Sequence, residues 1–352
     1  MSVLQEGAAI DNVSHALIGS AVVALAPPEV QPAVVWGVLL GAESPDFDYV
    51  IRMLGGKVKY LKHHRGPTHG LITLPLHALA IAGILHLLWP GAEFAQIFWW
   101  TLAGGLSHVI FDFGNDYGTQ GLWPFKRRWV AFDLLPIIDL WVLGLIAAGW
   151  AVTLVTPLHR QAVFIVVWGL IAAYVAYRFW LRRRAWRLVS DRFDMDDACG
   201  EAVPCGPGWR EERLVIHPTL LSLNAWRYVA QKRGEYLTGM VLVREGKVTE
   251  PVRAQNMYDR VVQASLKAQI VGAFADWVRK PRVTVERQQD MYLVKWTDMR
   301  YDTEDFSPFT AFAWLDDELK LVDEGLGEQK PTGVTWNDVK KRLRQEMGRL
   351  EP

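Results

Sequence analysis

The sequence is poor in cysteine: Cys199 and Cys205 are the only two in 352 residues. One pair at this spacing is too little for a disulfide framework or a cysteine-bound zinc, and we interpret both as ordinary thiols of a reducing compartment. Met1–Asp11 is not expected to be a secretory signal, because it has no basic flank and carries two acidic residues. Internal repeats and low-complexity segments are absent as well, which excludes the repeat proteins.

The sequence has no excess of charge of either sign, since 38 Lys and Arg balance 38 Asp and Glu. The net charge of the chain therefore does not indicate a nucleic-acid partner, and no direct nucleic-acid binding is expected. The local distribution is uneven: residues 66–177 hold almost no Lys or Arg apart from Lys126–Arg128 and Arg160, whereas residues 178–352 are charged throughout. This contrast predicts a membrane-embedded part followed by a soluble part.

Long apolar runs are present where the charges are scarce. Four of them are long enough to cross a bilayer, which takes about 20 residues: Gly70–Trp89, Phe94–Phe113, Leu134–Val155 and Gln161–Leu181. Several of the 17 tryptophans flank these runs, as in the aromatic belts of membrane proteins. Two shorter runs, Val13–Ala26 and Ala33–Gly41, predict a buried or re-entrant helical hairpin.

Basic residues between the apolar runs set the expected orientation. They gather in 52–65, 114–133 and 178–187, while 90–93 has none and 156–160 has one. Cytoplasmic segments carry the excess of Lys and Arg in bacterial membrane proteins. We therefore expect a multi-pass protein of the bacterial inner (cytoplasmic) membrane, with four alternating spans and the soluble domain in the cytoplasm.

Beyond Arg187 the sequence becomes soluble in character. The expected division is a helical membrane domain over 1–187, a linker over 188–208 and a cytoplasmic α+β domain over 209–352. Strands are expected at Ala225–Ala230, Tyr236–Val243, Arg282–Glu286, Met291–Trp296 and Thr310–Leu315, and helices at Ala254–Trp277 and Trp336–Leu350. The expected fold class is an α-helical membrane domain, with about four transmembrane helices plus a short helical hairpin, followed by a small α+β soluble domain.

Histidine and aspartate gather where the chain enters or leaves the apolar helices. His108 and Asp112, four residues apart, share one face of a helix and can both reach one metal ion. Asp11 and His15 repeat this spacing, although Asp11 also suits a helix N-cap. Taken alone, the pair of His108 and Asp112 is equally compatible with a hydrogen bond that fixes helix packing.

Two further clusters lie between the hairpin and the first span. Asp46 and Asp48 end a short apolar run, and in an extended segment both carboxylates would face one site; the alternative is a helix end with solvated acids. His64 and His69 flank a turn and can converge from its two sides. Arg65 between them suits a phosphate oxygen, or else the acidic head groups of lipids.

Other polar residues stand near the same helix ends. Asn115, in the loop after the second span, can hydrogen-bond a substrate or a ligand. Asp133 and Asp139 flank the start of the third span, and Asp139 lies inside its apolar run. Whether Asp11, Asp133 and Asp139 are themselves ligands stays open.

Together these residues predict a metal centre. The expected ligands are His15, Asp46, Asp48, His64, His69, His108 and Asp112. Histidine and carboxylate in similar number favour zinc, or manganese or iron, over calcium and magnesium, and the set is large enough for two or more ions. A site with several ions suits phosphoester hydrolysis, because one ion activates water while its neighbour stabilises the leaving oxygen.

The order of these motifs resembles that of the YdjM-like family. It consists of His15, Pro45-Asp46-x-Asp48, His64-Arg65-Gly66-x-Thr68-His69 and Ser107-His108-x-x-x-Asp112. The resemblance covers about residues 10–180, and the members of the family are bacterial inner-membrane proteins classed as metal-dependent hydrolases. It implies a membrane-bound hydrolase and assigns no substrate.

The chain is more distantly similar to the zinc-dependent phospholipase C and P1-type nuclease group. Those helical enzymes hold three zincs with an early His, an Asp, a His and a later His-x-x-x-Asp, an order that this chain follows from His15 to Asp112. It lacks their N-terminal Trp ligand and their last His-x-x-x-Glu/Asp pair, for which Asp139 is a partial substitute. The similarity therefore does not extend to a third ion.

These observations predict a membrane-bound metal-dependent hydrolase of a phosphoester, such as a lipid or lipid-linked phosphate, at the cytoplasmic membrane face. In this interpretation Arg65 holds a phosphate oxygen, and Asp139 orients or deprotonates the water. The alternatives are a protein that handles or transports metal ions, and a membrane scaffold whose soluble domain recruits a partner protein. A metalloprotease is not expected, since His-Glu-x-x-His does not occur.

Overall fold

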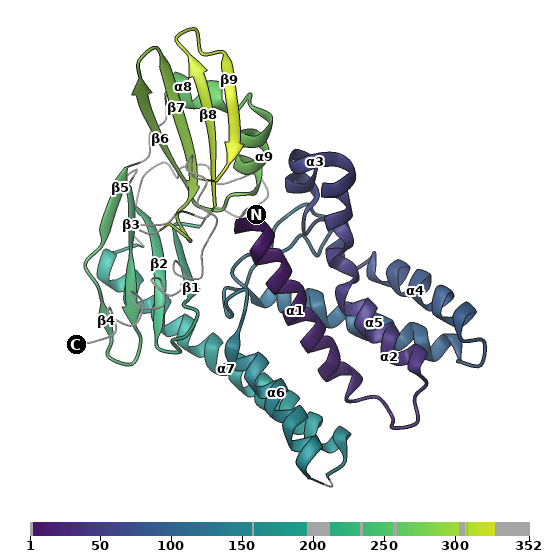
Figure 1. Cartoon of the computed structure of the whole chain (residues 1–352). Helices are drawn as coiled ribbons and strands as arrows, with labels where there is room; N and C mark the ends of the chain where they lie inside the picture. Colours follow the sequence, from purple (N-terminus) through teal and green to yellow (C-terminus); the bar gives the residue numbers. More distant parts are fainter. Residues whose placement is uncertain are drawn as a thin grey trace. The chain divides into compact units, whose positions relative to one another are not determined.

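The computed structural model describes residues 3–156, 158–195, 212–232, 235–255, 259–302, 307 and 309–327 (Figure 1). The chain divides into two units, Ala9–Trp180 and a second that comprises Met1–Ala8 with Leu181–Pro352. The helix expected at Trp336–Leu350 and both cysteines lie outside the described residues.

Helices make up the first unit (Figure 1). In chain order they are α1 (Val3–Val23), α2 (Pro32–Glu43), the 3-10 turn η1 (Ser44–Asp48), α3 (Tyr49–His63), the 3-10 turn η2 (Pro67–His69), α4 (Leu74–Leu88), α5 (Phe94–Gly114), α6 (Leu140–Val155) and α7 (Arg160–Phe193). The expected hairpin is α1 and α2. The basic segment from Arg52, expected as a loop, is instead helix α3, which is broken at Gly56 where φ is 76°. Helix α7 continues to Phe193, past the expected end of the membrane domain at 187.

Two of the described helices, α5 and α7, are each long and apolar enough to cross a membrane. A third crossing would need the segment Val58–His69 together with α4, and this pair bends by 81° at the break. Helix α6 is apolar but has only 16 residues, because it starts after the cap Asp139 instead of at Leu134. The described residues therefore contain two or three candidate spans, and the expected count of four is not confirmed.

Small residues bring α2 and α5 close together. A Cβ atom added to Gly41 would clash with the carbonyl oxygen of Thr101, and one added to Gly104 would clash with that of Val38. Glycine permits such close backbone approach, and small residues are common at helix contacts in membrane proteins. Helices α1, α6 and α7 share a buried apolar cluster of their own. The close crossing of α2 and α5 places His108, one turn after Gly104, beside the end of α2.

Strands make up most of the described second unit. They are β1 (Leu214–Pro218), β2 (Ala225–Lys232), β3 (Glu235–Leu242), β4 (Lys247–Val248), β5 (Val252–Gln255), β6 (Pro281–Gln288), β7 (Met291–Asp298), β8 (Thr310–Asp316) and β9 (Leu321–Leu326). Strands β1 to β4 follow one another in one antiparallel sheet, with β5 paired to β3, and β6 to β9 form a second antiparallel sheet. All five expected strands are confirmed, since each overlaps an observed strand.

The single helix expected over Ala254–Trp277 is wrong in its extent. The structure has strand β5 followed by two short helices, α8 (Arg260–Ser265) and α9 (Gln269–Trp277). The interruption has a local cause, because Asp259 caps the start of α8 with its side chain. Trp296 of β7 donates a hydrogen bond to Ser265 Oγ at 3.1 Å, so α8 packs on one face of the second sheet.

Candidate metal centre

Six side chains from four elements meet in the helical unit. They are Asp11 and His15 of α1, Asp46 of η1, His69 of η2, and His108 and Asp112 of α5. None of these residues is more than 9% exposed. Elements far apart in the chain therefore build one buried cluster, which we call the His–Asp centre.

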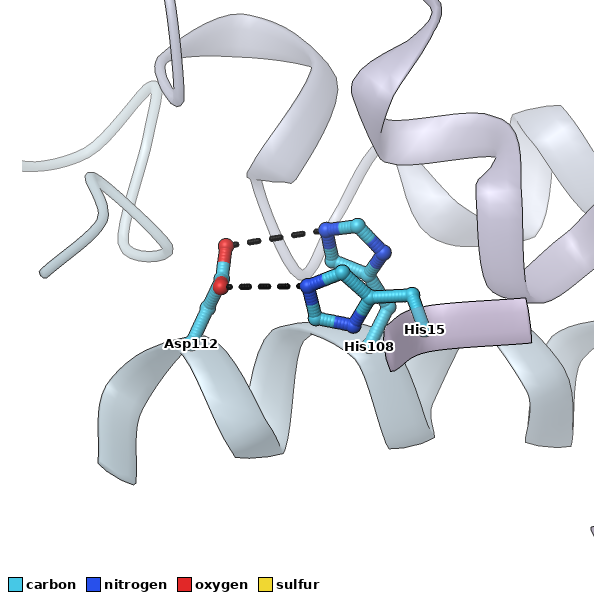
Figure 2. Close-up of side chains that lie close together, drawn as sticks. All are labelled: His15, His108 and Asp112. Atoms are coloured by element: carbon cyan, nitrogen blue, oxygen red, sulfur yellow. Dashed lines mark ion pairs between the residues drawn. The ribbon is translucent and has the colours of Figure 1, made fainter. Parts of the chain in front are cut away.

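Helices α1 and α5 meet at this centre through two imidazoles (Figure 2). The rings of His15 and His108 stack with their centroids 3.6 Å apart. Asp112 directs its two oxygens to different rings: Oδ1 is 3.5 Å from His15 Nε2, and Oδ2 is 3.6 Å from His108 Nε2. The four-residue spacing of His108 and Asp112 thus places both side chains on one helix face, as expected.

Asp46 and His69 complete the centre. His69 Nε2 lies 3.3 Å from Asp46 Oδ1, and the same distance separates it from Asp112 Oδ2 and from His108 Nε2. The other ring nitrogen of His108, Nδ1, is 2.6 Å from the carbonyl oxygen of Ala42. A carbonyl oxygen only accepts, so Nδ1 carries the proton and Nε2 keeps its lone pair for a metal ion.

Four atoms of the centre are buried without a hydrogen bond: Asp11 Oδ1, Asp112 Oδ2 and both ring nitrogens of His15. Nearly all buried polar atoms in proteins have a partner, so each of these requires an explanation. The residues form three groups, and in each group one ligand atom from every member lies within 4.8 Å of the others. The groups are His15, His108 and Asp112; Asp46, His69 and His108; and Asp11, His15 and Asp46. Imidazole and carboxylate gathered in this way fit a divalent transition-metal ion.

Asp48 and His64, both expected as ligands, form a separate pair beside the centre. His64 Nδ1 is 3.1 Å from Asp48 Oδ2, and neither residue belongs to the three groups. The extended conformation considered for Asp46 and Asp48 is wrong, because both residues lie in the 3-10 turn η1, which has Pro45 in its first turn, and a turn directs the two carboxylates differently. Burial would raise the pKa of Asp48, but His64 and His69 hold that pKa below its ordinary value. A ligand role for this pair stays a prediction.

Arg65 is buried against the centre, with 2% of its surface exposed. Its guanidinium contacts Asp11 Oδ2, lies 3.1 Å from Asp112 Oδ1 and stacks over the ring of Tyr117 at 4.5 Å. The structure therefore joins this arginine to the carboxylates of the centre. Binding of a phosphate oxygen by Arg65 stays a prediction.

Asn115 and Asp139 lie beside the centre. Asn115 donates to Asp112 Oδ1 at 3.1 Å and so helps to hold that carboxylate. Asp139 caps α6 with Oδ1, while its Oδ2 accepts a hydrogen bond from Tyr174 at 2.8 Å. Both residues line a cavity of about 20 Å³ that reaches His15. Their expected actions on substrate and water stay predictions.

Asp11 and Glu43 are acidic residues that the ligand set expected from the sequence does not include. Asp11, which the sequence leaves open, joins the His–Asp centre, and the signal for it is the same four-residue spacing to His15 that occurs in α5. Glu43, half-buried at the end of α2, has no such signal. Its Oε1 is buried without a hydrogen bond, and burial raises its pKa to about 7. Asp133 is buried too but lies outside the three ligand groups.

Helices that can cross a bilayer and a buried His–Asp centre define an integral membrane protein with a candidate metal site. The chain belongs to the YdjM inner membrane protein family, which matches residues 10–185. This range contains every residue of the His–Asp centre, and it confirms the family resemblance of the motifs. The similarity to the phospholipase C and P1-type nuclease group stays a prediction.

The second unit matches the YfhP C-terminal alpha/beta plait domain over residues 260–332. Over its length the chain is 24% identical to an uncharacterized protein, YfhP, of Bacillus subtilis (strain 168). That alignment covers 97% of this chain and 100% of the relative, so it spans both units. No solved structure matches the chain significantly.

Proposed function

We propose that this membrane protein is a metal-dependent hydrolase of phosphoesters, with a lipid or lipid-linked phosphate as its substrate class. The observation that carries the proposal is the His–Asp centre, in which four buried side-chain atoms lack a hydrogen bond. An unsatisfied buried polar group costs about 1–3 kcal/mol. Packing alone therefore does not account for a cluster with several such atoms, whereas a bound metal ion would satisfy them.

Zinc suits these ligands best, with manganese and iron as the alternatives. Two of the three ligand groups have only Asp46 in common: one adds His69 and His108, and the other adds Asp11 and His15. Asp46 would belong to both ligand sets if each set held an ion. We therefore propose a centre of two ions.

Divalent ions in such a centre supply activated water and neutralise the charge on a leaving oxygen. The residues of the chain itself supply positioning. Asn115 holds the carboxylate of Asp112 and, with Asp139, lines the cavity next to His15. Asp139 Oδ2, which accepts a hydrogen bond from Tyr174, can orient a water molecule in that cavity or take a proton from it.

The position of the centre along the helices supports a substrate at the membrane surface. His108 and Asp112 stand in the last two turns of α5, while Asp46 and His69 belong to the short turns η1 and η2. A phosphorylated head group can reach ligands at a helix end while its chain remains in lipid. By the charge rule for membrane proteins this face is cytoplasmic, and we propose that the α/β unit lies on the same side.

Metal content and turnover of the purified protein in detergent test the proposal. We expect about two zinc ions per chain and phosphatase or phosphodiesterase activity that a chelator abolishes. The change His108→Ala should remove both metal and activity. The matched change His86→Ala alters a histidine in the last turn of α4, which contacts the carbonyl oxygen of Ala92, and should remove neither.

Two outcomes would favour the alternative functions, metal handling and a membrane scaffold. Protein that carries metal but hydrolyses no phosphoester would favour a role in handling or transporting metal ions. Unchanged metal content in both His108→Ala and His69→Ala would contradict the metal centre itself. In that case a scaffold whose α/β unit recruits a partner protein would become the leading hypothesis.

A further inference from the structure

Arg65 has a backbone conformation that is held in place from both sides. Its φ is 53°, in the left-handed region that residues other than glycine rarely adopt. The N–H group donates to Asp48 Oδ2 at 2.9 Å, and the carbonyl oxygen accepts from Thr119 Oγ1 at 3.1 Å and from the N–H group of Gln120 at 2.9 Å. A non-glycine residue kept in this region by its surroundings indicates a functional constraint.

The guanidinium of Arg65 faces two carboxylates of the His–Asp centre. Its Nη2 contacts Asp11 Oδ2, and its Nη1 lies 3.1 Å from Asp112 Oδ1. The remaining oxygens, Asp11 Oδ1 and Asp112 Oδ2, are the two that lack a hydrogen bond. They lie 3.5 Å from His15 Nε2 and 3.3 Å from His69 Nε2, respectively. Each aspartate thus has one oxygen on the arginine and its other oxygen directed toward an imidazole, and Asp112 Oδ1 lies near both Arg65 and His15 Nε2.

Two neighbouring carboxylates in a buried site repel each other unless a positive charge lies between them. A guanidinium supplies that charge together with a planar fork, which fixes the orientation of the carboxylates it contacts. We infer that Arg65 is a positioning residue, a built-in counter-cation that holds Asp11 and Asp112 side by side, each with one oxygen turned to the metal position. The inference rests on the metal centre proposed above.

This role differs from the binding of a substrate phosphate. Nη1 and Nη2 both contact protein acceptors, and the arginine is 2% exposed. A phosphate oxygen would have to displace Asp11 or Asp112 to reach either nitrogen. Loss of a positioning residue should change the response of the protein to metal, whereas loss of a substrate-binding residue should change KM alone.

The test compares Arg65→Met with Arg178→Met. Arg178 is 1% exposed, and its Nε donates to the carbonyl oxygen of Leu134 outside the His–Asp centre, so it is a matched buried arginine. Thermal unfolding is followed in detergent without metal and with saturating zinc. For Arg65→Met we expect the metal-free Tm to fall by about 10 °C. The rise on adding zinc should be about twice that of the wild type, because the ion supplies the missing positive charge.

The control and the conservative change separate positioning from packing. Arg178→Met should lower Tm by the same amount with and without zinc. Arg65→Lys keeps the charge without the fork and should recover most of the metal-free Tm. An equal zinc-induced rise in wild type and Arg65→Met would overturn the inference. A raised KM for a phosphoester at unchanged zinc affinity would also overturn it, in favour of substrate binding.

A second measurement distinguishes this inference from the metal proposal. Asp11→Asn removes one of the two carboxylates that the guanidinium contacts. In metal-free protein it should lower the Tm of the wild type but raise the Tm of Arg65→Met, because it relieves the unbalanced charge. Strictly additive effects of the two changes would overturn the inference. If this coupling is present but zinc has no effect on the wild type, the pairing stands and the metal proposal falls.

Discussion

Two buried clusters of charge, one in each unit of the chain, differ in their hydrogen bonds. In the α/β unit Asp298 and Arg300 are 1% and 0% exposed, and the arginine donates to both oxygens of the aspartate at 2.7 to 3.1 Å. In the helical unit Asp11, His15 and Asp112 are similarly buried, yet each keeps an atom without a hydrogen bond. The first arrangement is complete within the protein, whereas the second leaves buried atoms that could hold a metal ion.

This difference separates a structural ion pair from a candidate binding site. Both are costly to disrupt, because leaving one partner of a buried pair uncompensated destabilises a protein by about 3–5 kcal/mol. We expect only the arrangement with unsatisfied atoms to gain stability from an added cation, and this expectation rests on the metal centre proposed above. The exposed pairs of the α/β unit belong to neither class: the side chains of Arg287 and Asp317 are 61% and 50% exposed.

The largest effect is expected from Asp112→Asn in the helical unit. The amide removes the charge of a carboxylate that faces both His15 and His108, so zinc affinity should fall by about 100-fold or more, and hydrolysis should be lost. Equilibrium dialysis measures the affinity, and phosphoester turnover measures the activity. Zinc affinity close to that of the wild type would show that unsatisfied atoms in this unit do not mark a site.

Asp298→Asn is the matched change in the α/β unit. It leaves the buried guanidinium of Arg300 without its charged partner, so the free energy of unfolding should fall by about 3 kcal/mol. The zinc content should not change, because Asp298 belongs to no ligand group. Denaturant unfolding and metal analysis on the same sample check both statements. A concurrent loss of zinc would contradict the distinction between the two classes of buried charge.

Glu43 of the helical unit should make the stability of the metal-free protein depend on pH. Burial raises its pKa from 4.5 to about 7, so between these values the folded state keeps a proton that the unfolded state has lost. Metal-free protein should therefore lose stability as the pH rises through this window. Because the side chain is only half-buried, Glu43→Gln should stabilise the protein by about 1 kcal/mol at pH 8 and by almost nothing at pH 4. Thermal unfolding at both pH values tests this, and an equal gain at each would exclude titration as the cause.

The smallest effect is expected from Arg287→Ala. Its ion pair with Asp317 is exposed, and such pairs contribute little because water screens them. The free energy of unfolding should change by less than about 0.5 kcal/mol, and the zinc content should stay constant. Denaturant unfolding at low and high salt measures the contribution. A loss of more than 1 kcal/mol, on the order of a buried group, would weaken the contrast between surface and buried charge.

Local features of both units could be predicted from the sequence. The apolar run expected at Phe94–Phe113 is observed as α5 with one further residue, and the strand expected at Met291–Trp296 lies within β7. Helix α6 was placed too early, at Leu134, because a long apolar run does not reveal where the cap Asp139 begins the helix. The length of an apolar run and the alternation of apolar and polar residues predict which segments are buried, but they do not predict where a helix begins or ends.

The sequence by itself determined the apolar helices, five of the strands and the spacing that places His108 and Asp112 on one helix face. These depend on residues that are neighbours in the chain. Only the tertiary structure decided which ligand candidates meet. It brought Asp11 into the centre, and it turned Arg65 toward carboxylates. The physical reason is that membership depends on how closely separate helices approach, and α2 approaches α5 closely only because glycine stands at their contact.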